Sequence, residues 1–234
     1  MPIPKIPTIP SYPMPTPGSL PTPVVDWEVE ADRAVLLIHD MQRYFLNPFT
    51  AGDSPRAELE ANVAALRGWA VSRDVPIIYT AQPGGMSAEE RGLLRDFWGW
   101  GMRRDDGGRT IPPDLAPRTV DTVLTKWRYS AFHWTGLDDR LRELGRDQLV
   151  ICGVYANTGC LVTAVDAFSR DLETFLVHDA VADFSESQHR QALEYAAARC
   201  AAIPATGDVL NSLDTSGSSD SSDAPAGAVV APPR

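Results

Sequence analysis

The feature that most constrains the fold is an unbroken run of four aliphatic residues, Val35 to Ile38, which ends directly on His39 and Asp40. A short run without polar interruptions is typical of a strand buried on both faces, as in a parallel sheet covered by helices. In open α/β sheets, ligands bind beyond the carboxyl ends of the strands, so Asp40 lies where a functional carboxylate is expected. The alternative is that Asp40 only caps a helix beginning near Met41, because aspartate is a favoured N-cap residue.

Further short apolar runs alternate with segments of helical periodicity. Strands are predicted at 75–80, 122–125, 148–152, 174–177 and 201–205, and helices at about 55–72, 137–144, 160–171 and 185–199. This alternation specifies a parallel sheet with right-handed crossovers and helices on both faces. The predicted fold class is therefore α/β, a three-layer α/β/α, Rossmann-like domain with a parallel sheet of about six strands.

Composition divides the chain of 234 residues into three parts. Residues 1–25 are rich in proline, which fixes φ and removes hydrogen-bond donors, so we expect an extended arm. The three-residue spacing of Ile6, Ile9 and Tyr12 favours an arm that packs on the domain. Residues 26–213 form the predicted domain, and residues 214–234 are predicted to be a disordered acidic tail rich in serine and proline.

Charge and composition exclude several classes of protein. The net charge of −10 argues against binding to nucleic acid or to an anionic membrane surface. No segment approaches the roughly 18 apolar residues that span a bilayer, and the N-terminus lacks a basic-then-apolar leader. The three cysteines have no zinc-binding or redox spacing, and the histidines are scattered without ligand spacing. We therefore expect a soluble, cytoplasmic protein without a metal or other cofactor.

Three predicted strand ends carry Asp40, Lys126 and the turn from Gly153 to Cys160. The surrounding motifs are HDMQRYF (39–45), TAQP (80–83), LTKWRYSAF (124–132), GVY (153–155) and DAVADFS (179–185). Together, from about Trp27 to Leu210, they resemble the isochorismatase family, and more closely the isochorismatases of siderophore and phenazine pathways. The three-layer fold of that family agrees with the fold predicted above.

The resemblance implies a hydrolase that removes pyruvate from isochorismate or from 2-amino-2-deoxyisochorismate. The products are 2,3-dihydro-2,3-dihydroxybenzoate or trans-2,3-dihydro-3-hydroxyanthranilate. In this family the aspartate corresponding to Asp40 protonates the enolpyruvyl CH₂ carbon, with no cofactor. Asp40 must therefore hold a proton: burial raises its pKa, whereas a neighbouring Lys126 ammonium lowers it, and the sequence leaves the balance open.

By the same resemblance, Asp40 and Lys126 are the catalytic residues. The substrate-binding residues are Gln82, Arg91, Trp98, Tyr155, Phe45 and Gly153. Arg91 corresponds to the family's carboxylate-binding arginine, with an exposed helix arginine as the alternative, and Phe45 is either a pocket wall or a core residue. The turn at Gly153 contains a non-proline cis peptide bond in this family. The expected partners are a small dianionic substrate and a second copy of the chain in a homodimer.

The wider superfamily includes cysteine amidohydrolases with an Asp–Lys–Cys triad. Their nucleophile lies six positions after the glycine of the turn, which is Gly159 here and not Cys160. One residue is about 100° around a helix, so Cys160 is expected to point elsewhere and to be a small buried residue. A cysteine amidohydrolase and a catalytically silent scaffold protein remain as alternatives. Asn157 and Trp100 replace the histidine and proline usual in the pathway enzymes, which leaves substrate preference open.

Overall fold

A single parallel sheet forms the centre of the molecule. The computed structural model describes residues 6–104 and 107–212. In these residues five strands pair in the order β3-β2-β1-β4-β5. Their bounds are Ala34–His39 (β1), Ile77–Ala81 (β2), Thr122–Thr125 (β3), Gln148–Val154 (β4) and Glu173–Ala182 (β5). The predicted α/β class is confirmed, with β1 in the middle of the sheet.

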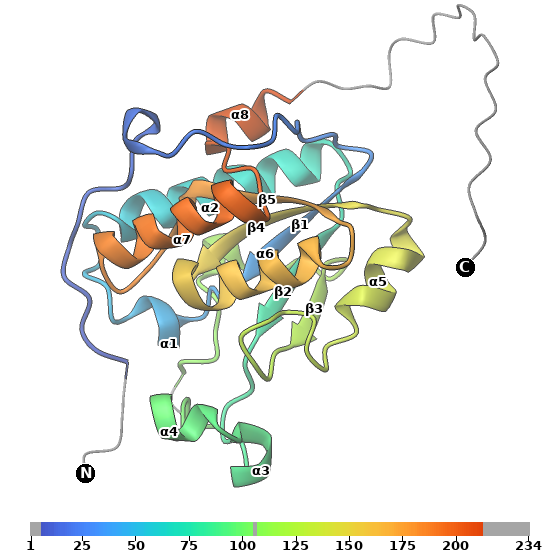
Figure 1. The fold of residues 1–234 in the computed structure, drawn as a ribbon. Coiled ribbons are helices and arrows are strands. Elements are labelled where there is room, and N and C mark those ends of the chain that lie inside the picture. The colour runs from blue at the N-terminus through green and yellow to red at the C-terminus, as the bar shows by residue number, and fades with distance from the viewer. Residues whose placement is uncertain (1–5, 105–106, 213–234) are drawn as a thin grey trace, which may run out of the picture.

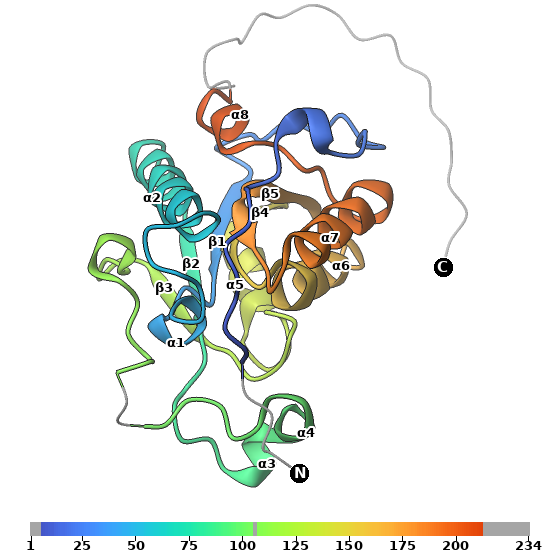
Figure 2. The same cartoon turned by 90° about the vertical axis from the view of Figure 1, so that its left-hand side faces the viewer.

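Helices cover both faces of the sheet (Figures 1 and 2). One face carries α2 (Arg56–Ser72) and α8 (Thr206–Leu210), and the other carries α5 (Leu137–Leu144), α6 (Leu161–Phe168) and α7 (Glu186–Arg199). Three short helices follow the carboxyl ends of β1 and β2: α1 (Arg43–Leu46), α3 (Ala88–Arg91) and α4 (Leu94–Trp98). They stand beyond the sheet at the edge where ligands bind in such folds.

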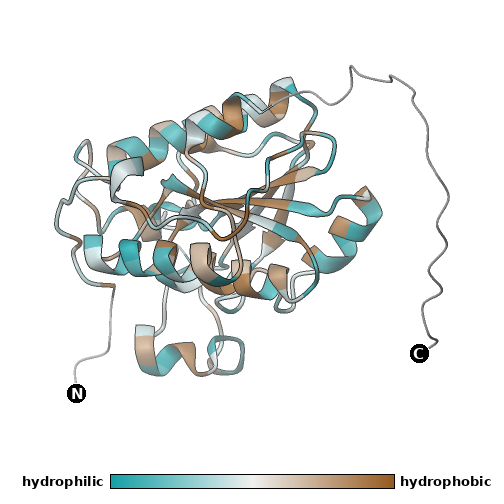
Figure 3. Ribbon diagram, turned by 45° about the horizontal axis from the view of Figure 1, so that its top comes forward, coloured by the Kyte–Doolittle hydropathy of each residue, from teal (hydrophilic) through white to brown (hydrophobic). Residues whose placement is uncertain are grey.

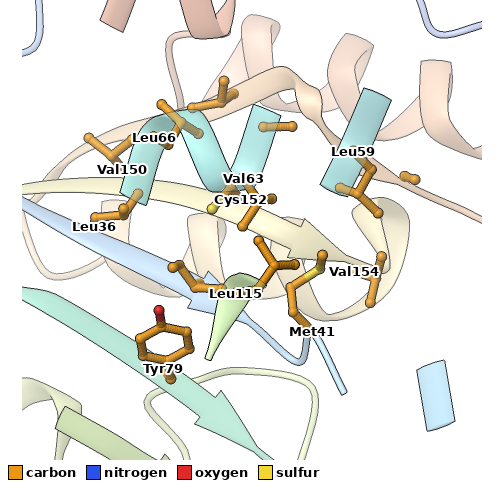
Figure 4. Packing of buried hydrophobic residues seen from close by; sticks show 14 of the residues in the cluster. Leu36, Met41, Leu59, Val63, Leu66, Tyr79, Leu115, Val150, Cys152 and Val154 are labelled. Atoms are coloured by element: carbon orange, nitrogen blue, oxygen red, sulfur yellow. The ribbon is translucent and has the colours of Figure 1, made fainter. Parts of the chain in front are cut away.

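The two-sided burial of β1 explains its uninterrupted apolar sequence. Leu36 and Ile38 pack in the cluster on the α2 side, whereas Val35 and Leu37 pack in the cluster on the α6 and α7 side. Figure 4 shows Leu36 beneath residues of α2, and Figure 3 shows apolar strands between helices with polar outer faces. Full burial of each such side chain contributes about 1.5–3 kcal/mol, so the strand is fixed in place by its packing.

The prediction of about six strands is wrong by one. Residues 201–205 form only an isolated bridge, between Ala202 and Phe175, instead of a sixth strand. Pro204 explains the difference, because it has no N–H to donate to a ladder. The last strand, β5, is instead longer than predicted, extending to Ala182 with a register shift against β4 between Ile151 and Gly153.

The proline-rich arm lies on the domain. Ile9 is fully buried and pairs with Phe49, and Tyr12 is nearly buried in the same apolar cluster as α2. The predicted tail at 214–234 lies outside the described residues. No helix in the described part of the chain has the length and apolar character needed to cross a membrane.

Candidate active site

Strand register brings the two predicted catalytic residues, Asp40 and Lys126, together at one edge of the sheet. His39 of β1 pairs with Thr80 of β2, and the backbone N–H of Lys126 donates to Ala81 O at 2.9 Å. Asp40 follows directly with φ of 51°, a left-handed conformation that is uncommon outside glycine and found at functional sites. As a result Asp40 Oδ2 lies 3.0 Å from Lys126 Nζ, although the two are far apart in sequence.

The surroundings of Asp40 favour its ionised form. The Thr80 hydroxyl donates to Asp40 Oδ1 at 2.6 Å, and the Lys126 ammonium donates to Oδ2. Both side chains of the ion pair are almost completely buried. Burial alone raises the pKa of Asp40, but the charge of Lys126, helped by His39 and Thr80, outweighs it and holds the pKa below its ordinary 3.8. The sequence left open whether burial or Lys126 dominates the pKa of Asp40. In the structure Lys126 dominates, so Asp40 is a carboxylate in the free protein.

The turn after β4 forms the neighbouring wall. The Val154–Tyr155 peptide bond is cis, which confirms the expectation from the family turn. The His39 Nδ1 atom lies 2.8 Å from Val154 O, and burial lowers the pKa of His39 to about 4, so the imidazole is neutral and Nδ1–H donates to that oxygen. Gly153 lies against the His39 backbone, where an added Cβ would be 2.1 Å from His39 O. Only glycine therefore allows β1 and β4 to approach so closely.

At the sequence position of the amidohydrolase nucleophile the chain has Gly159, and the ring of His39 occupies the space where a side chain would begin. Gly159 lies in a single π-helical turn, Ala156–Cys160, and a Cβ added to it would lie 2.2 Å from Cε1 of the His39 ring. Cys160 is fully buried in the apolar cluster under α6 and α7 and does not line the pocket. Burial raises the pKa of the Cys160 thiol well above its ordinary value, so the thiol is not activated.

Arg91 reaches the pocket from α3. A capping box between Ser87 and Glu90 starts this short helix. The Arg91 guanidinium is buried, donates from Nε to Gly99 O at 2.9 Å and from Nη1 to Gln82 Oε1 at 3.2 Å. Burial lowers its pKa, and among the described residues no carboxylate forms an ion pair with it. A buried cation without an anionic partner is suited to bind an anionic ligand.

Aromatic side chains enclose the other side. Tyr155 donates its hydroxyl to Phe45 O at 2.7 Å and packs on Phe184 with ring centroids 4.2 Å apart. Trp98 also stacks on Phe184, with ring centroids 5.4 Å apart, and donates from Nε1 to the Tyr129 hydroxyl at 2.7 Å. Tyr155, Trp98 and Phe184 line the same pocket as the Asp40–Lys126 pair and supply its aromatic wall.

The structure brings seven of the eight predicted site residues into one pocket, whereas Gly153 lies behind it. The pocket is lined by Ile6, His39, Asp40, Phe45, Gln82, Arg91, Leu94, Trp98, Lys126, Tyr129, Val154, Tyr155, Thr158, Gly159 and Phe184. Tyr129 and Phe184 were missed although both stand inside the motifs quoted above, so those motifs held the signal. Ile6 had no such signal, because it lies in the proline-rich arm.

Two further predictions concern residues around the pocket. Asn157 and Trp100, which depart from the pathway enzymes, are not among the lining residues. Asn157 N–H donates to the Asp183 carboxylate, and Trp100 is half exposed against Arg95. Within the described ranges, no group of three or more histidine, cysteine or acidic side chains is arranged to hold a metal ion.

Comparison with known proteins now places the chain. The sequence profile of the isochorismatase domain family matches residues 34–208. The chain belongs to the isochorismatase family. Among its relatives is the phenazine biosynthesis protein PhzD1 of Pseudomonas aeruginosa, with 57% identity over 88% of this chain and 98% of the relative.

Other relatives of this isochorismatase-family chain include an isochorismatase and a component of enterobactin synthase. The isochorismatase of Bacillus subtilis is 51% identical over 89% of this chain and 67% of its own length. Enterobactin synthase component B of Escherichia coli is 46% identical over 88% of this chain and 72% of its own length. Among solved structures, a cysteine hydrolase from Pseudomonas syringae has a TM-score of 0.72 with 24% identity, covering 81% of this chain and 96% of that one. That likeness shows the shared fold alone.

Proposed function

We propose that this isochorismatase-family protein hydrolyses the vinyl ether of isochorismate or of 2-amino-2-deoxyisochorismate and releases pyruvate. The main support is the buried Asp40–Lys126 pair in the pocket. At the position of an amidohydrolase nucleophile the chain has Gly159, which packs against the His39 ring. Relatives named for isochorismatase and phenazine biosynthesis, at 51% and 57% identity, support the same substrate class. A cysteine amidohydrolase is not supported, because Cys160 is buried outside the pocket.

In the proposed reaction Asp40 is the general acid. Asp40 begins as a carboxylate, since Lys126 and Thr80 hold its pKa low. A dianionic substrate bound beside Lys126 offsets the positive charge of that ammonium, which raises the pKa of Asp40 and favours uptake of a proton from solvent. Asp40 then transfers this proton to the enolpyruvyl CH₂ carbon.

Protonation of the carbon leaves an oxocarbenium ion, which captures water to form a hemiketal. Collapse of the hemiketal breaks the ether bond and yields pyruvate and 2,3-dihydro-2,3-dihydroxybenzoate or trans-2,3-dihydro-3-hydroxyanthranilate. Arg91 and Gln82 are proposed to hold a carboxylate of the substrate, and the aromatic wall of Trp98 and Tyr155 is proposed to orient the ring. Together these groups provide a positive site inside a chain of net charge −10.

Pyruvate release on addition of isochorismate tests the reaction. In D₂O the methyl group of the pyruvate should gain one deuterium, because Asp40 delivers a solvent-derived proton to that carbon. Parallel kcat/KM measurements on isochorismate and its 2-amino analogue identify the preferred ring substituent. Absence of pyruvate with both compounds, from a folded protein, contradicts the proposed function.

A second experiment tests the acid itself. Because the pKa of Asp40 is low in the free protein, substrate binding should take up about one proton. Calorimetric titration with an analogue whose enolpyruvyl group is reduced to a saturated ether, which binds but cannot be protonated at carbon, measures this uptake in buffers of different ionisation enthalpy. The Asp40→Asn variant should bind without it. Equal uptake by both proteins assigns the proton to another group.

We also propose that the chain forms a homodimer in the cytoplasm. Three large apolar side chains on and beside α4, Leu93, Phe97 and Trp100, are between half and more than three-quarters exposed. An exposed apolar group of this kind is typical of a surface that is covered by another protein. Light scattering of the purified chain measures its mass in solution, and a monomer at micromolar concentration contradicts this proposal.

A further inference from the structure

The proline-rich arm supplies one wall of the pocket. Ile6 is partly buried and lines the same cavity as Asp40, Lys126 and Arg91. The family match begins only at residue 34, so this residue lies outside the segment that defines the domain. We propose that Ile6 is a specificity-determining residue that contacts the ring of the substrate. The inference rests on the proposed function and adds a binding residue to it.

A backbone anchor holds Ile6 in place from one side. The N–H of Ile9 donates to Pro48 O at 2.9 Å, and Ile9 is fully buried beside Phe49. The segment that follows α1 is thus paired with the arm. Only two residues separate Ile6 from this anchor, and one of them is Pro7, whose ring fixes φ. The wall is therefore largely preorganised before a ligand arrives.

A side-chain anchor at Tyr12 fixes a second point of the arm. The Tyr12 hydroxyl accepts a hydrogen bond from Asp183 N at 2.8 Å and lies 3.3 Å from Nδ1 of His189. Asp183 immediately precedes Phe184, which lines the pocket between Trp98 and Tyr155. The arm consequently runs between two segments that both contribute to the pocket, and Figure 2 shows it descending toward α3 and α4.

The chemistry of Ile6 complements that of the polar groups. Asp40, Lys126 and Arg91 can satisfy charged and polar groups of a ligand, but they offer no surface for the C–H edges of a six-membered carbocycle. Ile6 and Leu94 are the aliphatic residues that the arm and α4 bring to this pocket. An aliphatic wall stabilises the bound ring by excluding water from its carbons. An acidic side chain at this position would instead repel a dianion.

The test compares substitutions at two positions on the same arm. Ile6→Ala and Ile6→Asp remove the apolar contact, and Ile6→Asp adds a repelling charge. Val24→Ala is the matched control, because Val24 is an aliphatic arm residue that is 75% exposed. Pyruvate release by the full-length chain is measured against isochorismate concentration, and thermal unfolding is recorded for each protein.

We expect Ile6→Ala to raise KM about tenfold with kcat within about twofold, because it removes apolar contact with the ring in ground and transition states alike. Ile6→Asp should raise KM further, and Val24→Ala should match the wild type. All variants should unfold near the wild-type temperature. If both Ile6 variants keep the wild-type KM in an active protein, this inference is overturned and the proposed function stands. A folded wild type that releases no pyruvate overturns both.

Discussion

Two regions of the pocket differ in how the chain holds them. The floor, defined as Asp40 and Lys126 together with Thr80, which supports Asp40 from below the pocket lining, consists of buried strand-end residues that are fixed by sheet register. The rim, defined as Ile6, Arg91 and Trp98, comes from the arm and from the short helices α3 and α4. In Figure 1 these helices stand apart from the layered body, whereas the strands of the floor lie inside it.

The difference separates chemistry from binding. A proton donor must be held in one geometry, and a strand inside a packed sheet provides such a fixed position. The rim only has to recognise the ligand, and it is attached through a few hydrogen bonds, such as that from Trp98 Nε1 to the Tyr129 hydroxyl. We therefore expect changes in the floor to lower kcat and changes in the rim to raise KM.

The strongest test of this comparison is Asp40→Asn. The substitution keeps the shape of the side chain but removes the transferable proton, so kcat should fall about 10²–10⁴-fold. KM should change by only a few fold. The matched control is Asp114→Asn, which makes the same chemical change at an exposed position. A variant that retains more than a tenth of the wild-type kcat removes Asp40 from its proposed role.

Arg91→Ala tests the rim. Loss of a charge-assisted hydrogen bond to a carboxylate costs about 1.5–3 kcal/mol, so KM should rise roughly 10- to 100-fold with little change in kcat. The KM of Arg91→Lys should lie between those of the wild type and Arg91→Ala, because a lysine keeps the charge but loses the bidentate geometry. Arg95→Ala is the control, since the Arg95 side chain lies on the neighbouring helix, is about half exposed and does not line the pocket. If Arg91→Ala lowers kcat by as large a factor as it raises KM, Arg91 takes part in the chemical step as the floor residues do.

Gly159→Cys tests why this pocket has no nucleophile. The new Cβ would meet the His39 ring, so we expect loss of about 1–3 kcal/mol in stability and at least a tenfold lower kcat. Cys160→Ala should keep most of its activity, because this thiol faces the core. In the double variant His39→Ala/Gly159→Cys the clash is gone, so part of the lost stability should return. Amide hydrolysis by Gly159→Cys alone would contradict the assigned packing.

The positions of Asp40 and Lys126 in the floor were predictable from the sequence, because the signals for them lie in short segments of the chain. The apolar run before Asp40 is a strong strand signal, and the parallel sheet then brings Asp40 and Lys126 to one edge. The false strand at 201–205 shows the limit of this reasoning, because Pro204 interrupts a ladder that the apolar pattern favours.

The rest of the site depends on contacts between segments that are distant in sequence. The spacing of apolar residues in the arm predicts that the arm packs on the domain, but the pairing of Ile9 with Phe49, which brings Ile6 to the pocket, has no signal in the sequence. Likewise, the sequence suggested only a structural role for His39. Its packing against Gly159 becomes visible only when β1 and the turn after β4 lie side by side.

The smallest expected effect concerns the carboxylate that supports the rim. Asp183 is buried, its backbone N–H donates to the Tyr12 hydroxyl, and its carboxylate accepts from the N–H groups of Asn157 and Phe184. Burial raises its pKa to about 6, although those N–H groups lower it. Because the folded pKa exceeds the ordinary 3.8, Asp183 stabilises the fold at low pH, and this contribution is lost as pH rises through about 6.

Asp183→Asn isolates this contribution from others in the same pH range. Burial lowers the pKa of His39 and His189 to about 4, so these groups have the opposite effect and destabilise the fold as pH falls from about 6.5 toward 4. Their effect is common to both proteins and cancels in the difference. The stability of the wild type relative to Asp183→Asn should therefore rise by about 2 kcal/mol between pH 7 and pH 4.5. Urea unfolding at both pH values measures it, and a constant difference would show that Asp183 stays ionised in the fold.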